Sequence, residues 1–212
     1  MQKTFIFDFD GTLVDSMPVF VGAIYNILDK YKVPYTEEIV KILTPLGGQA
    51  GAEYMRKMGV PITTEQVLEL MFEYMVKEYE HNVLAKEGVV ETLKQMKERG
   101  YSLNVLTASP HLTLDPCLKR LKIFDIFDNV WSCDDFNTTK ANPEIYAQAS
   151  KLLKKSVEQV IFVDDNFNAC ATAKKAGMKV YGIFDKSSQD YVEEIKSVAD
   201  GYAYKFSELL EV

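Results

Sequence analysis

Hydrophobic residues follow two different spacings along the chain, and the change falls shortly before Gly88. From Ser16 to about Asn82, apolar residues recur every three or four positions, which is the spacing of one face of an amphipathic helix. From Gly88 onward, short apolar runs alternate with helical segments. The pattern therefore predicts a block of helices followed by alternating strands and helices.

Glycines and cap-type residues divide the helical block. Shorter helices are predicted around Thr36–Leu43 and Gln49–Met58, and the segment Gly47-Gly48-Gln49 is predicted to form the turn between them. A longer helix starts after Thr63 or Thr64, whose hydroxyl groups suit the N-cap position.

The apolar runs outside this block are rich in β-branched and aromatic residues. They predict strands at Lys3–Phe9, Ser102–Leu106, Val130–Cys133, Val160–Val163, Lys179–Ile183 and Gly201–Tyr204. Strands that alternate with helices build a parallel, doubly wound α/β sheet. The helical block is then an insertion after the first strand. The predicted α/β core contains residues 1–15 and 84–212, and the helical domain contains residues 16–83.

Composition narrows the class of protein. The chain has 212 residues, 47% hydrophobic and 26% charged, which suits a globular domain that carries a smaller insertion. Its formal net charge of −7 argues against nucleic acid or an anionic membrane as a partner, and no apolar window is long enough to span a bilayer. Three widely spaced cysteines, Cys117, Cys133 and Cys170, predict buried reduced thiols of a cytoplasmic protein and not a disulfide framework or a zinc site.

Polar residues whose side chains can bind ligands or take part in a reaction follow several of the predicted strands. Ligands of open parallel sheets bind beyond the carboxyl ends of the strands. The residues expected at that edge are Asp8, Asp10, Thr107, Lys140, Asp164 and Asp165. One hydroxyl, one ammonium and four carboxylates are a set suited to phosphoryl transfer, because they combine a nucleophile with groups that hold phosphate and a metal ion.

Asp8 and Asp10 are two apart on the first predicted strand, so they are expected to share a face. Two carboxylates so close together repel each other, and a hard divalent cation such as Mg²⁺ bound between them would relieve the repulsion. The alternative is that Asp10-Gly11 only makes a turn, which would leave Asp8 without an explanation.

Each of the other residues also has a purely structural interpretation. Thr107 and Ser109 could cap the helix that follows, Lys140 could be an exposed lysine, and Asp164-Asp165 could be an N-cap pair. Their joint occurrence at successive strand ends favours a functional site. His111, close to Ser109 in the sequence, is predicted to have a capping or surface role.

These motifs resemble the haloacid dehalogenase superfamily of aspartate-nucleophile phosphatases, in the group that inserts a helical cap after the first strand and includes phosphoglycolate phosphatases and beta-phosphoglucomutases. The first motif, Asp-x-Asp-Gly-Thr-x-x-Asp-Ser, matches residues 8–16 without a gap. Thr107 matches the second motif, and Lys140 ahead of residues 143–146 matches the third. Asp164-Asp165 with residues 176–178 matches the fourth.

The resemblance implies a role for each matched position. Asp8 would be the nucleophile, and Asp10 the general acid and base. Mg²⁺ would bind the Asp8 carboxylate, the Asp10 carbonyl, and Asp165 with or without Asp164. Thr107, the Ala108 amide and Lys140 would hold the phosphoryl oxygens. The implied substrate is a small phosphorylated metabolite.

The chain departs from the family pattern in two places. Ala141 follows Lys140 where relatives usually have proline, and Ala169 stands where some relatives have a further aspartate. In the cap, Gly48 and Gln49 are the candidates for substrate selection. The segment 47–50 offers no cation for the second phosphate that a mutase must hold, so hydrolysis is favoured over a sugar-phosphate mutase activity. A receiver-type signalling module is a remote third alternative, since receivers are much shorter and lack a helical insertion.

Overall fold

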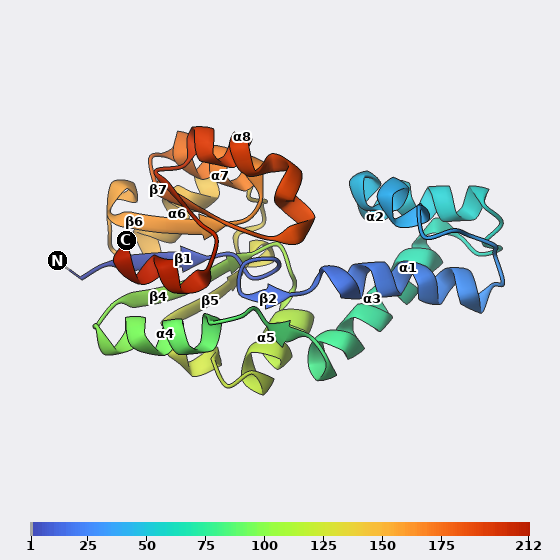
Figure 1. Ribbon diagram of the computed structural model, residues 1–212, viewed down its shortest axis with the longest axis horizontal. Helices are drawn as coiled ribbons and strands as arrows, with labels where there is room; N and C mark the ends of the chain where they lie inside the picture. The colour runs from blue at the N-terminus through green and yellow to red at the C-terminus, as the bar shows by residue number, and fades with distance from the viewer. Residues whose placement is uncertain (1) are drawn as a thin grey trace. The chain divides into compact units, whose positions relative to one another are not determined.

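The computed structural model describes residues 2–212, with the side chains at positions 41, 44, 45 and 47 left aside. The chain divides into two compact units (Figure 1). The first contains residues 1–15 and 84–212, and the second contains residues 16–83. No helix in the described part of the chain is both long and apolar enough to cross a bilayer.

The first unit is built on a six-stranded sheet in which every neighbouring pair is parallel. Its strands are β1 (Thr4–Phe7), β4 (Ser102–Thr107), β5 (Asn129–Ser132), β6 (Val160–Asp164), β7 (Lys179–Ile183) and β8 (Gly201–Ala203). They lie in the order β5-β4-β1-β6-β7-β8. The predicted doubly wound α/β class is therefore confirmed, and each predicted strand overlaps an observed one.

Helices cover both faces of this sheet because β1 is apolar on both sides. Ile6 joins a core with helices α6, α7 and α8, whereas Phe7 packs its ring 5.6 Å from that of Phe206 on the opposite face. The helices of the unit are α4 (Val89–Glu98), α5 (His111–Arg120), α6 (Glu144–Leu152), α7 (Phe167–Ala176) and α8 (Val192–Val198). Short 3₁₀ segments occupy η1 (Phe124–Ile126), η2 (Cys133–Phe136), η3 (Val157–Gln159), η4 (Lys186–Tyr191) and η5 (Phe206–Glu211).

The strand order reverses direction at β1. The chain places β4 and then β5 on one side of β1, and β6, β7 and β8 on the other. In sheets of this kind the loops diverge above the reversal point and leave room for a ligand. The residues that follow β1, β4 and β6 are therefore the ones that the fold brings to a common site.

A two-stranded antiparallel ribbon, which the sequence did not predict, joins the two ends of the helical insertion. It pairs β2 (Val14–Asp15) with β3 (Leu84–Ala85). Both strands are only two residues long, too short for periodicity to reveal them. All three cysteines are buried free thiols, as the sequence predicted.

The second unit contains α1 (Met17–Lys30), α2 (Ile39–Lys57) and α3 (Thr64–His81) around a shared apolar core. The predicted start of α3 is confirmed: the Thr63 side chain accepts a hydrogen bond from Gln66 N, and Thr63 N donates to the Gln66 side chain.

The prediction of a turn at Gly47-Gly48-Gln49 was wrong, since these residues lie inside α2. Buried Leu43 and Met55 lie on either side of them, and burial of apolar residues outweighs the cost of glycine in a helix, about 1 kcal/mol per residue. The helix is sharply bent there. A β-carbon added at Gly51 would lie 3.8 Å from the Leu43 carbonyl oxygen, whereas eight residues of straight helix advance about 12 Å.

Gly182 of β7 is required by close packing. A β-carbon added there would lie 2.4 Å from Ile195 Cγ2 and 2.5 Å from Cδ2 of Tyr202, its neighbour on β8. We expect Gly182→Ala to lower the free energy of unfolding by about 1–3 kcal/mol, because the core must shift to admit the methyl group. Urea unfolding measures the change, and an unaltered midpoint would contradict this packing.

Candidate active site

Asp8 leaves β1 at its carboxyl end and is buried. Its backbone N–H donates to Val163 O of β6 at 2.9 Å, so the ladder with β6 continues one residue beyond the strand. The strand itself ends at Phe7, which makes the expected shared strand face of Asp8 and Asp10 wrong. Asp10 lies in the following turn, where its carboxylate accepts a hydrogen bond from Ser109, whereas that of Asp8 contacts Lys140.

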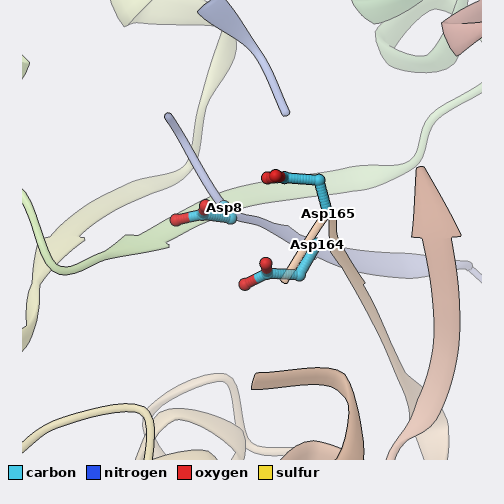
Figure 2. A group of neighbouring side chains, drawn as sticks. All are labelled: Asp8, Asp164 and Asp165. Atoms are coloured by element: carbon cyan, nitrogen blue, oxygen red, sulfur yellow. The ribbon is translucent and has the colours of Figure 1, made fainter. Parts of the chain in front are cut away.

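Asp164 is the last residue of β6, and Asp165 follows it, with both beside Asp8. One carboxylate oxygen from each of the three residues lies within 4.8 Å of the others, and Figure 2 shows the three side chains directed to the same side. The N-cap interpretation of the pair was wrong. Asn166 caps α7 by accepting a hydrogen bond from Ala169 N at 3.2 Å, and Asp164 Oδ1 accepts one from Asn166 N at 2.7 Å.

Lys140 supplies the positive charge beside these carboxylates. Its Nζ lies 2.6 Å from Asp8 Oδ1 and 2.8 Å from Asp164 Oδ2, and only 13% of the side chain is exposed. The interpretation of Lys140 as an exposed lysine was therefore wrong. The hydroxyl of buried Tyr146 lies 3.0 Å from Lys140 O, which holds the loop even though Ala141 replaces the usual proline.

The protonation of the cluster is dominated by burial. Burial raises the pKa of Asp8 to about 7; Lys140 opposes the shift and the Asp164 carboxylate adds to it. Burial likewise raises the pKa of Asp165 well above its usual range, and Asp164 and Asp8 reinforce it. Burial alone would lower the pKa of Lys140, but the charges of Asp164 and Asp8 outweigh it and raise that pKa.

This arrangement fits a hard divalent cation. Three buried carboxylates face one ammonium group, so negative charge remains in a place where burial disfavours it. Oxygen ligands of this kind are those that Mg²⁺ prefers. The Asp10 carboxylate does not belong to the three-carboxylate group found among the described residues.

Gly11 lets the first loop approach Asp165. Its φ of +74° favours glycine, and a β-carbon there would lie 2.7 Å from both Asp165 carboxylate oxygens. Thr12 Oγ1 donates to Asp165 Oδ1 at 3.3 Å from the same turn. The Gly11-Thr12 pair of the first motif therefore positions the Asp165 carboxylate.

Thr107 and Ser109 do not cap the following helix. Pro110 is the N-cap of α5 and makes no side-chain cap bond. Instead, Thr107 Oγ1 accepts a hydrogen bond from Ser109 N at 3.1 Å, and Ser109 Oγ donates to Asp10 Oδ2. Ala108, between them, is exposed. The loop after β4 thus lies directly beside the first motif.

Lys86 is a residue that the sequence interpretation missed. Its Nζ donates to Gly11 O, to Phe184 O at 2.6 Å and to Asp185 Oδ2 at 2.9 Å. It therefore ties the first-motif turn to the end of β7. The partners lie 75 to 99 residues away in the chain, so a single lysine after an apolar residue carries no signal of this role.

His111 lies between two carboxylates at the start of α5. Its Nδ1 is 2.7 Å from Asp115 Oδ1 and its Nε2 is 3.0 Å from Asp135 Oδ2, so both bonds form only when the ring carries two protons. The hydrogen bond with Asp115 is the main cause that raises the pKa of His111 above its ordinary 6.5, and Asp135 adds to it.

We expect Asp135→Asn to lower the pKa of His111 toward 6.5, as measured by NMR titration of the ring. In the wild-type protein the imidazolium stabilises the fold fully below pH 6.5, and the contribution is lost as pH rises through the raised pKa. An unchanged titration in the variant would contradict the contact.

Comparison with known proteins agrees with this geometry. The family model of haloacid dehalogenase-like hydrolases matches residues 5–183. The chain belongs to this family. It is 27% identical over 214 residues to the pyrophosphatase PpaX of Bacillus cereus (strain Q1), which covers 99% of this chain and 95% of that protein.

Two solved structures show the same fold as this haloacid dehalogenase-like hydrolase. A protein of Thermotoga maritima assigned as a beta-phosphoglucomutase has a TM-score of 0.84 and 24% identity, covering 99% of this chain and 97% of the other. A protein of Haemophilus somnus 129PT assigned as a phosphoglycolate phosphatase has a TM-score of 0.81 and 21% identity, with the same coverage.

Proposed function

We propose that this hydrolase is a Mg²⁺-dependent phosphatase that cleaves a small phosphate monoester through an aspartyl-phosphate on Asp8. The observation that carries the proposal is the contact of buried Asp8 with Lys140 beside Asp164 and Asp165, at the point where the strand order reverses. Membership of the hydrolase family and the likeness to PpaX support the same reaction type.

Mg²⁺ would be held by the carboxylates of Asp8 and Asp165, with or without Asp164, and by the carbonyl of Asp10. When bound, it supplies positive charge that offsets the phosphate and keeps the carboxylates ionised. Lys140, already in contact with Asp8, would also neutralise the incoming phosphoryl group and so reduce its repulsion from the nucleophile.

The reaction then proceeds in two steps. An Asp8 oxygen attacks phosphorus, the bond from phosphorus to the ester oxygen breaks, and Asp10 gives its proton to the departing alcohol. Water next attacks the phosphorus of the aspartyl-phosphate and gives a proton to Asp10, which releases phosphate and restores Asp8. Thr107, the Ala108 amide and Lys140 would hold the phosphoryl oxygens.

A substrate screen with the purified protein tests this proposal. The panel contains phosphoglycolate, sugar phosphates, nucleoside monophosphates and pyrophosphate, and phosphate release is measured with Mg²⁺ and with a chelator. We expect release from at least one of these phosphate compounds, with loss of activity on chelation. Exposed Asp190→Asn serves as a control for the loss of one carboxylate.

Two other results would favour an alternative function. A requirement for a bisphosphate activator, with conversion of one sugar phosphate into another and no phosphate release, would establish a mutase. A stable phospho-aspartate at Asp8 without turnover would indicate the receiver-type alternative, which the family match over residues 5–183 already disfavours.

A further inference from the structure

A side-chain contact joins the loop after β4 to the first motif, and the mechanism above does not use it. Ser109 Oγ donates a hydrogen bond to Asp10 Oδ2 across 99 residues of sequence. The two side chains come from turns beyond β1 and β4, which are neighbours in the sheet. The contact therefore links the phosphate-holding loop to the proposed acid.

Both hydrogen-bond donors of Ser109 are engaged within the protein. Its backbone N–H donates a hydrogen bond to Thr107 Oγ1 at 3.1 Å, and its hydroxyl group donates one to Asp10 Oδ2. Because Thr107 Oγ1 accepts the first bond, its own proton can be given to another group. Within this loop, phosphate binding is thus left to Thr107 and the Ala108 amide, and Ser109 has a different task.

We propose that Ser109 is a positioning residue that fixes which oxygen of Asp10 carries the proton. The inference rests on the proposed phosphatase function. When Oδ2 accepts a hydrogen bond from Ser109, the protonated Asp10 carries its proton on Oδ1. That proton passes to the leaving oxygen as the ester bond breaks, and water later returns a proton to the same oxygen.

If Ser109 positions the proton of Asp10, the loss of activity on removing its hydroxyl should depend on the leaving group. An alkyl alcohol leaves slowly without a proton, whereas 4-nitrophenol departs readily as an anion and needs little help from an acid. A residue that only binds phosphate would affect both esters alike, since they share the phosphoryl group. The two kinds of substrate therefore distinguish a residue that positions Asp10 from one that binds phosphate.

The experiment compares kcat/KM of Ser109→Ala and wild type on 4-nitrophenyl phosphate and on the best alkyl phosphate from the screen. The ratio kcat/KM reports the step in which the alcohol leaves. We expect a loss of about 10–100-fold for the alkyl ester and less than about 3-fold for the aryl ester. Inhibition by inorganic phosphate should be unchanged, and Ser109→Thr, which keeps the hydroxyl, should recover most of the loss.

A double-mutant cycle isolates the link with Asp10. Asp10→Asn should show the same selectivity more strongly, and Ser109→Ala should have no further effect in that background. Exposed Ser207→Ala is the matched control. Circular dichroism and the unfolding midpoint check that each variant folds, and the substrate ratio within one variant is unaffected by partial unfolding.

Two results would overturn the role of Ser109 while leaving the phosphatase intact. Equal losses on both esters with weaker inhibition by phosphate would make Ser109 a phosphate ligand. Unchanged activity on both esters would make the contact structural only. Failure of the wild-type protein to hydrolyse any ester would instead remove the proposed function, and this inference would fall with it.

Discussion

Replacement of Asp8 by asparagine is expected to abolish turnover and leave the fold intact. An amide cannot form the covalent phosphate intermediate, so the loss should be at least about 10⁴-fold, as for other nucleophile replacements. Phosphate release with the best substrate measures it, and Asp190→Asn, which removes an exposed carboxylate, should retain wild-type activity. Turnover near the wild-type rate would refute Asp8 as the nucleophile.

Asp8→Asn is also expected to raise stability at pH 8, and this increase would show that the variant is folded. Burial raises the pKa of Asp8 from 3.8 to about 7, so the folded state binds more protons than the unfolded state between these values. Without a divalent ion, the contribution of Asp8 to wild-type stability is then greatest below pH 3.8 and is lost as pH rises from there through about 7. Asp8→Asn lacks this loss, so its unfolding midpoint at pH 8 should exceed that of the wild type.

The largest expected loss of stability follows removal of the Lys140 ammonium. Lys140→Met keeps much of the side-chain volume but leaves Asp8 and Asp164 buried without their cation. Removal of one partner from a buried ion pair costs about 3–5 kcal/mol. Urea unfolding at pH 8 measures the change, and Lys94→Met, which removes an exposed lysine of α4, is the control.

The cause of this loss can be tested by pH and by Mg²⁺. Acidification lets the unpaired carboxylates take up protons, so the stability of Lys140→Met should approach that of the wild type as pH falls toward 5. Added Mg²⁺ should also recover part of the stability, because it binds the folded carboxylate cluster. A destabilisation that is the same at pH 5 and pH 8 would show that lost packing, and not charge, is responsible.

Local patterns in the sequence were sufficient for the fold class. The runs at Ser102–Leu106 and Lys179–Ile183 are strands with mostly buried side chains, and the turn at Gly177 ends α7 with a φ of +100°. Such elements are set by residues close in the chain, through apolar periodicity and the special conformations of glycine. The same reasoning placed Asp8, Thr107 and Asp164 at or just beyond strand ends.

Local patterns failed where distant packing decides the backbone. The glycines at positions 47 and 48 favour a turn by themselves, yet α2 continues through them because residues on either side are buried in the core of the second unit. The early end of β1 at Phe7 is another case. The turn after it packs Gly11 closely against Asp165, a residue far away in the sequence.

By itself, the sequence determined the parallel α/β architecture and the residues that stand near the carboxyl ends of its strands, because both follow from short-range periodicity and motif order. Only the tertiary structure decided which of these side chains meet. The order of the strands puts β6 beside β1, and so it places Asp164 next to Asp8 and lets Lys140 reach both. Pairings such as Ser109 with Asp10 and Lys86 with Gly11 join segments 75 or more residues apart. A local pattern cannot predict these contacts, because it depends only on residues close in the chain.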